Sequence, residues 1–148
     1  MTEQFGPGRW TRVAAYALAI DDVGRILIVR VSPGYPAAGR WTLPGGGLNF
    51  GEDPAAGVLR ELTEETGLTG AVASIAFVDS RIWPARLEAN LGEWHAIRLV
   101  YLVDITGGEL RDERDESTDA AAWFTRDEAR QMPIVDLVKK ALDHIDAG

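Results

Sequence analysis

Three glutamates, Glu61, Glu64 and Glu65, are the residues in this sequence most suited to chemistry. The apolar residues around them recur at helical spacing, so we expect a helix there. At about 100° per residue, Glu64 lies about 60° to one side of Glu61, and Glu65 lies about 40° to the other. The three carboxylates therefore share one arc of the helix. An adjoining arc carries the apolar residues Ala55, Val58, Leu59 and Leu62.

This crowding of charge is unfavourable for a helix by itself. Like charges three and four residues apart destabilise a helix by a few tenths of a kcal/mol per pair. The helix dipole also disfavours anions near the C-terminal end. Hard divalent cations would relieve both penalties, and oxygen-only ligands favour magnesium or manganese over zinc or copper. Because magnesium shares its coordination sphere with phosphate oxygens, the pattern predicts a phosphate-containing substrate. A merely solvated charged face is the alternative.

A run of three glycines, Gly45 to Gly47, precedes the helix. Glycine allows a positive φ or a close approach of the backbone to another group. A carbonyl exposed in this run would be one more hard oxygen ligand for a cation. A plain turn explains the glycines equally well.

The full pattern resembles the Nudix box. Gly46 is followed after five residues by Glu52, and after seven more by residues 60–68, which read RELTEETGL. Seven positions demand a fixed residue, so a chance match at a given start is on the order of 10⁻⁸ at roughly 7% usage per residue. Residues 41–46, WTLPGG, are similar to the family's usual lead-in. The resemblance implies an α+β fold, a Nudix-type α/β/α sandwich with a mixed central sheet.

The resemblance also implies roles for the residues of the box. Glu61, Glu64, Glu65 and the carbonyl of Gly45 would bind magnesium, with manganese as a possible substitute. Glu61 and Glu64 are in addition candidate catalytic residues. The loop and helix would be supported by four further residues, Gly46, Glu52, Arg60 and Gly67.

The general base varies within the family. Some members use a glutamate of the box, and others use one from a loop near the final strand. Here that loop carries Glu113, Asp115, Glu116 and Asp119. We rank Glu116 first because it shortly precedes the predicted last strand. A solvated run of charge is the competing interpretation.

The family's substrate preference is set outside the box. Pro84 falls sixteen residues after Leu68, similar to the proline of ADP-ribose-type members. Trp83 is a candidate to stack on a base, although it would serve as well as a partly buried aromatic residue. His95 and Arg98 are candidate phosphate contacts or ordinary sheet-surface residues. We therefore expect a nucleoside diphosphate derivative, with a slight preference for ADP-ribose-like or nucleoside triphosphate substrates.

Two other functions compete with hydrolysis of a diphosphate. A non-catalytic nucleotide-binding sensor or regulatory module would use the same fold, but such members usually lose a box glutamate and this chain keeps them all. Isomerases that share the fold rely on a cysteine. This chain has no cysteine, which argues strongly against that chemistry.

Composition limits the partners of the protein. The 148 residues are suited to one domain, residues 1–148. The net charge of −8 argues against a nucleic acid polymer as a partner. It also suggests that cations stand between the protein and an anionic nucleotide. A homodimer is a further possibility that the family suggests.

The location predicted from the sequence is cytoplasmic. The absence of cysteine is compatible with a reducing compartment. Residues 1–8 lack the basic patch and apolar stretch of a signal peptide. The apolar run 13–20 is too short to cross a membrane.

Periodicity and turn residues predict the elements that must position the box. Residues 10–20 and 25–31 read as a hairpin around the turn 21–24, and 32–40 as a loop. A helix should begin near Pro54, with Asp53 as N-cap, and end at Gly67. Further strands are expected at 71–78, 97–105 and 120–124, with connections at 81–94 and 107–118. Residues 125–128 read as a capping box that opens a helix, and Pro133 should separate it from a last helix at 134–146.

Overall fold

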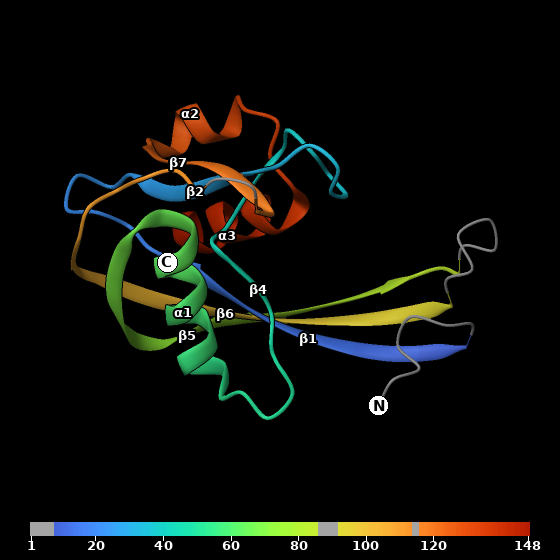
Figure 1. Cartoon of the computed structure of the whole chain (residues 1–148). Coiled ribbons are helices and arrows are strands. Elements are labelled where there is room, and N and C mark those ends of the chain that lie inside the picture. Colours follow the sequence, from blue (N-terminus) through green and yellow to red (C-terminus); the bar gives the residue numbers. More distant parts are fainter. Residues whose placement is uncertain (1–7, 86–91, 114–115) are drawn as a thin grey trace.

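The computed structural model describes residues 8–85, 92–113 and 116–148 (Figure 1). Residues 1–7, expected not to form a signal peptide, and Asp115, a candidate base, lie outside the described residues. In the described part of the chain, no helix has the length and apolar character needed to cross a membrane.

The larger of two sheets contains four strands in the order β4-β1-β6-β5. Strand β1 is parallel to β6, whereas the other two pairings are antiparallel. The mixed sheet predicted from the sequence is therefore confirmed. The four strands are Gly45–Gly47 (β4), Arg9–Leu18 (β1), Glu93–Gly108 (β6) and Leu68–Trp83 (β5).

A smaller antiparallel sheet has the order β3-β2-β7. Its strands are Trp41–Thr42 (β3), Ile26–Val31 (β2) and Thr118–Phe124 (β7). Three helices complete the fold: Pro54–Thr66 (α1), Arg126–Arg130 (α2) and Asp136–Ala147 (α3).

The helices cover opposite faces of the larger sheet. Val58 and Leu62 of α1 pack with Ala15 and Ala17 of β1. The α3 helix shares a second core with Leu18 and with the smaller sheet. Because side chains alternate along a strand, odd and even positions of β1 face different layers. Figure 1 shows α1 beside the long strands and α3 beneath β2 and β7. This arrangement confirms the predicted α/β/α architecture.

The ends of α1 follow the predicted capping signals. The Asp53 side chain accepts a hydrogen bond from the Ala56 N–H at 3.1 Å. At the other end Gly67 has φ 78°, and its N–H donates to the Thr63 carbonyl at 2.9 Å. A β-carbon at Gly67 would overlap the carbonyl oxygen of Glu109. Glycine is therefore required there for both conformation and space.

The predicted hairpin between residues 10–20 and 25–31 is wrong. Strand β1 pairs with β4 and β6, whereas β2 pairs with β3 and β7. Only the ends next to the turn remain paired, through an Ile20–Ile26 bridge and a Leu27 N–H to Ala19 carbonyl bond. Residues 26–29 are buried on both faces, so β2 gains more apolar burial as a central strand than as one arm of a hairpin.

Other element boundaries also differ from prediction. The strands expected at 71–78 and 97–105 are each 16 residues long. The predicted connection 81–94 is therefore wrong at both ends, where Trp83 pairs with Trp94. The predicted loop 107–118 is shorter, because β6 continues to Gly108 and β7 begins at Thr118. At the other end of β5 and β6, Trp83 and Trp94 stack on each other, and this cross-strand stacking stabilises the longer pairing.

The capping box at residues 125–128 and the helix that it opens are confirmed. The last helix begins at Asp136, two residues later than predicted. Ile134 instead bridges to Trp41, and the Val135 N–H donates to the Trp41 carbonyl at 3.0 Å. Tertiary pairing with β3 thus takes the backbone groups that a longer helix would have used.

Candidate active site

Strand β4 lies directly against the carboxylates of α1. The Gly45 N–H donates a hydrogen bond to Glu65 Oε1 at 2.9 Å. A β-carbon at Gly46 would overlap Oε2 of Glu61. Gly45 itself has φ 149°, and a β-carbon there would overlap the Ala15 carbonyl oxygen of β1. The glycines therefore allow backbone and carboxylates to meet without intervening side chains.

Arg60 connects three box glutamates. Its Nε and Nη2 donate to the two carboxylate oxygens of Glu52 at 2.7 and 3.0 Å. Its Nη1 donates to Glu64 at 2.8 Å and to Glu61 at 3.2 Å. The two-pronged bond from Arg60 lowers the pKa of Glu52 to about 2. Glu52 and Arg60 thus form a fixed ion pair beside the other carboxylates.

Glu65 is only 4% exposed, and other carboxylates surround it. Burial raises the pKa of Glu65 to about 9, and the charges of Glu61, Glu113 and Glu64 add to the effect, against the Gly45 N–H. Burial also raises the pKa of Glu61, with Glu64 contributing in the same direction. Like charges held this close favour either a proton or a bound cation.

The donor set suits a hard cation, although it is not gathered into a finished coordination site. In the described ranges, no three acidic or histidine side chains are close enough together to hold a metal ion. Glu61 and Glu64 are instead turned toward Arg60. Carboxylate and carbonyl oxygens are nevertheless the ligands that magnesium prefers. Binding would require Glu61 and Glu64 to rotate away from Arg60.

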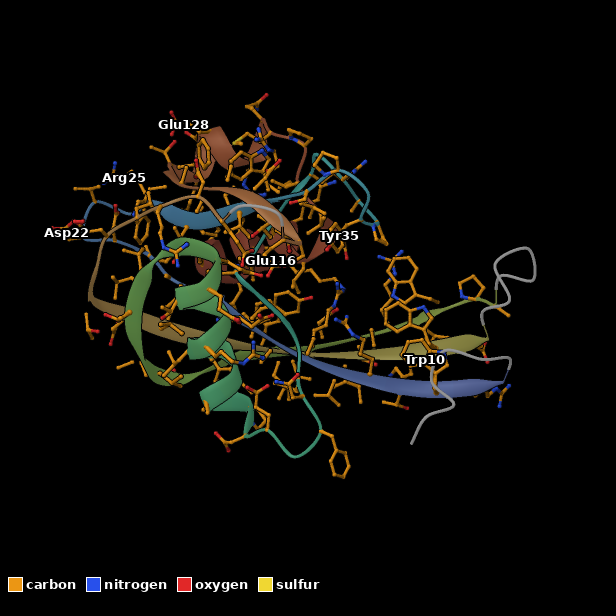
Figure 2. The ribbon with its side chains drawn as sticks, in the orientation of Figure 1. Trp10, Asp22, Arg25, Tyr35, Glu116 and Glu128 are labelled. Carbon is orange, nitrogen blue, oxygen red and sulfur yellow. The ribbon has the colours of Figure 1, made fainter. Side chains whose placement is uncertain are left out.

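The loop before β7 brings a further carboxylate close to α1. Glu113 accepts a hydrogen bond from the Thr118 hydroxyl at 2.8 Å. Burial raises the pKa of Glu113, and the charges of Glu116 and Glu64 contribute. Glu116 is exposed on the same loop (Figure 2). The remaining candidate, Asp119, is paired with Arg30 at 2.8 Å. Among the described residues of this loop, Glu113 acts electrostatically on Glu65 of the box, and Glu116 acts on Glu113.

Beyond the end of β4, three strands continue as an arm that consists of residues 9–13, 80–83 and 93–97 (Figure 1). Trp83 stacks on Trp94 with ring centroids 5.9 Å apart, and Trp94 stacks on Trp10 at 5.1 Å. The Arg81 guanidinium lies 3.9 Å from the Trp83 ring centroid. Pro84 is exposed directly after this stack. Figure 2 labels Trp10 on the arm, to one side of α1.

Strand register places six large side chains on one face of these strands, which we name the Trp/Arg face: Trp10, Arg12, Arg81, Trp83, Trp94 and Arg98. Sequence reasoning selected only Trp83 and Arg98 from this set. Trp10 and Arg12 were missed because their partners on β6 are more than eighty residues away. The alternation of Trp10, Arg12 and Tyr16 with smaller residues was the available signal.

The two candidate phosphate contacts have different surroundings. His95 Nε2 is 2.6 Å from the Ser80 hydroxyl and lies on the face opposite to Arg98. Arg98 donates to the buried carboxylate of Asp79, which Lys140 of α3 also contacts. Burial opposes the ionisation of Asp79, yet these hydrogen bonds hold its pKa below its ordinary value. The Arg98 side chain is 13% exposed, so the structure brings it into a buried ion cluster.

A pocket at the end of the arm is formed by both of its faces. It brings His95 together with Trp10 and Trp94 and leaves out Trp83, which is covered by Arg81. The residues that line it are Arg9, Trp10, Thr11, Ile82, Glu93, Trp94 and His95. Trp10 lies four residues before Ala14, the partner of Gly47. The pocket is therefore about 13 Å along β1 from the box loop.

Comparison with known proteins agrees with this geometry. Residues 10–144 match the family model for the NUDIX domain. An ADP-ribose pyrophosphatase from Methanocaldococcus jannaschii is 33% identical over 132 residues, which cover 86% of this chain and 68% of that protein. The crystal structure of a MutT NUDIX hydrolase from Burkholderia pseudomallei superposes with a TM-score of 0.76 at 31% identity, covering 92% of this chain and 98% of that one.

A more distant structure shares the fold. The NUDIX domain of Shewanella oneidensis NrtR, in complex with ADP ribose, has a TM-score of 0.70 at 18% identity and covers 95% of this chain and 88% of that one. The family model spans residues 10–144, which include the intact box. The chain therefore belongs to the NUDIX domain family and is a hydrolase of acid anhydrides in phosphorus-containing substrates.

Proposed function

We propose that this Nudix hydrolase cleaves the diphosphate bond of a nucleoside diphosphate derivative and that it needs magnesium, which manganese can replace. The observation that carries the proposal is the contact of the Glu61 and Glu65 carboxylates with the backbone of Gly45 and Gly46. A nearly buried carboxylate beside other anions favours a cation, and an oxygen-rich donor set favours magnesium.

Each box residue has a role in this proposal. Glu61, Glu64, Glu65 and the carbonyl oxygen of Gly45 would hold the cation. Arg60 keeps its bond to Glu52 while it releases Glu61 and Glu64. Bound magnesium would neutralise charge on the diphosphate and lower the pKa of a coordinated water. Gly46 and Gly67 keep the loop and the helix end free of obstructing side chains.

The reaction is a hydrolysis. The oxygen of water forms a bond to one phosphorus, the bridging P–O bond breaks, and the leaving phosphate takes the electron pair. A carboxylate accepts the proton of the attacking water, and two phosphate monoesters leave when the substrate is a nucleoside diphosphate sugar. We assign this proton transfer to Glu116 or to a box glutamate, Glu61 or Glu64. Glu113, whose charge acts on Glu65, is the nearest alternative.

An ADP-ribose-like substrate is the favoured class. One relative is named an ADP-ribose pyrophosphatase, and the NUDIX domain of NrtR was solved with ADP ribose. In this chain the pocket with Trp10, Trp94 and His95 offers aromatic surface for a base at a suitable distance from the box. Trp83 and Pro84 adjoin that pocket through the tryptophan stack. A nucleoside triphosphate is the second class.

Three further predictions concern the whole chain. We propose that residues 1–148 act as one Nudix domain. We also propose that this domain works in the cytoplasm, and that a homodimer is its assembly in solution.

A panel of nucleotides tests the activity. Wild-type protein and Glu64→Gln are incubated with magnesium and with ADP-ribose, other nucleoside diphosphate sugars or nucleoside triphosphates, and monophosphate products are quantified. We expect the wild type to release AMP and ribose 5-phosphate from ADP-ribose. A wild type that binds nucleotides but releases nothing would instead support the sensor function.

A further inference from the structure

Arg12 of β1 lies just past the point where β4 ends. Strand β4 pairs only with residues 14–16 of β1, so nothing in β4 lies opposite Arg12. Its guanidinium folds back over Gly47 at the end of β4. A β-carbon on Gly47 would lie 2.7 Å from Nη2 and 2.9 Å from Nε of Arg12. The guanidinium can therefore lie against the backbone of Gly47 only because this residue has no side chain.

Neighbouring glycines of β4 thus contact opposite charges. Gly46 borders the carboxylate of Glu61, whereas Gly47 borders the guanidinium of Arg12. Burial raises the pKa of the Tyr16 hydroxyl, and the charges of Arg12, Glu61 and Glu65 also act on it. Because side chains alternate along a strand, Arg12 and Glu61 approach β4 from opposite faces, one residue apart along it.

The two other arginines of the Trp/Arg face interact with neighbouring side chains, whereas the Arg12 guanidinium is available to a ligand. Arg98 is bonded to Asp79, and Arg81 is stacked on Trp83. Among the residues for which the structure gives positions, none forms a hydrogen bond or an ion pair with Arg12. In a chain with net charge −8, an exposed and unpaired guanidinium next to an acidic site is suited to an anionic ligand.

We propose that Arg12, seated on Gly47, binds the phosphate group of the substrate that is not attacked. The proposal rests on the function proposed above and deepens it. Guanidinium groups bind phosphate through two parallel hydrogen bonds. Arg12 lies two residues from Trp10, about 7 Å along β1, between the box loop and the aromatic pocket. The substrate would therefore run from the box across Arg12 to the tryptophans.

The test compares Arg12→Gln, Gly47→Ala, the double variant and the control Arg25→Gln. Arg25 also carries one exposed guanidinium, but it is paired with Asp21 and does not line the pocket. Dissociation constants for ADP-ribose are measured by calorimetry in EDTA, and KM and kcat in magnesium. Arg12→Gln should raise both Kd and KM about 10- to 100-fold, as for a lost charged hydrogen bond. The Arg12→Gln change should alter kcat much less, and Arg25→Gln should leave Kd and KM unchanged.

Gly47→Ala tests independently whether the contact between Gly47 and the Arg12 guanidinium matters for binding. Its added methyl group displaces the guanidinium, so it should weaken binding in the same direction as Arg12→Gln. In the Arg12→Gln background it should have little further effect, because the displaced group is already gone. Circular dichroism and urea unfolding of each variant establish that the fold is retained.

The outcomes separate this proposal from the proposed function. Unchanged Kd and KM in Arg12→Gln, or fully additive effects in the double variant, would overturn the role of Arg12 even if hydrolysis is normal. If the wild type binds ADP-ribose without hydrolysing it, the proposed activity fails, while a Kd that depends on Arg12 still supports this site. A wild type that binds no nucleotide at all overturns both.

Discussion

Glu65 is a carboxylate held in a position where ionisation is unfavourable. It is nearly buried, and neighbouring carboxylates add to the cost of its charge. A residue used only for packing would avoid this penalty, so the position favours a ligand that restores the charge. The same reasoning applies to Glu61, whose pKa is raised by burial. Both residues lie against β4, where the glycines leave room.

At the residue scale, we predict that Glu64→Gln and Glu65→Gln each lower kcat at least about a hundredfold, because each removes an electrostatic ligand of the cation. Without magnesium, the Glu65 variant should also be no less stable than the wild type, since glutamine keeps an acceptor for the Gly45 N–H and replaces a carboxyl group whose charged form is disfavoured there. The exposed Glu109→Gln is the matched control and should leave kcat unchanged. Steady-state kinetics in magnesium measure the effect. A near-normal kcat in either variant would refute the assigned metal role.

At the element scale, α1 depends on the conformation of Gly67, the residue that caps its C-terminal end. Gly67 and Gly51 have nearly equal φ values, 78° and 79°, but only Gly67 has neighbours that an added β-carbon would meet. We predict that Gly51→Ala costs about 1–2 kcal/mol of backbone strain. Gly67→Ala should cost more, because its β-carbon would overlap the Glu109 carbonyl. Urea unfolding measures both changes, and equal losses would contradict the packing explanation.

Helix α3 is tied to the larger sheet by a buried ion cluster. Asp79 of β5 accepts hydrogen bonds from Arg98 of β6 and Lys140 of α3. Because the pKa of Asp79 is lower in the folded protein, its ionised form contributes stability above the unfolded pKa of about 3.9. That contribution is lost as the pH falls through the lower pKa that Asp79 has in the folded protein.

We therefore predict that Asp79→Asn is less stable than the wild type by about 2 kcal/mol at neutral pH. The difference should narrow as the pH falls below about 4. Asp143→Asn on α3 is the control, because Asp143 forms an exposed pair with Arg130. Free energies of unfolding measured from pH 7 to pH 3 provide the test. A constant difference across this range would show that the charge of Asp79 is not responsible.

The elements differ in how far their sequence predicts them. Helix α1 was predicted closely because Asp53 and Gly67 act within one turn of the helix ends. The pairing of β1 with β6 was not predicted, because Trp10 and Trp94 are far apart in the sequence and the turn at 21–24 favours a local hairpin. The box residues were selected because they lie within one loop and one helix. Of the Trp/Arg face, only Trp83 and Arg98 could be selected from the sequence, because strands far apart in the sequence build this face.

At the scale of the whole molecule, an acidic chain must accommodate an anionic substrate. The net charge is −8, and several carboxylates gather around α1. A cation that binds only the folded protein stabilises it, by about 2.7 kcal/mol when present at 100 times its Kd. We predict that magnesium raises the midpoint of thermal unfolding by several degrees. The rise should be much smaller in Glu65→Gln, and an equal rise in both proteins would locate the cation elsewhere.

The central claim is that this Nudix domain hydrolyses a diphosphate bond with the aid of a divalent cation. The most direct measurement follows ADP-ribose by ³¹P NMR in the presence of the wild-type protein, first with EDTA and then after magnesium is added in excess. We predict that the diphosphate signals persist in EDTA and that two monophosphate signals replace them once magnesium is free. Diphosphate signals that persist in magnesium, while the protein binds the nucleotide, would contradict the claim.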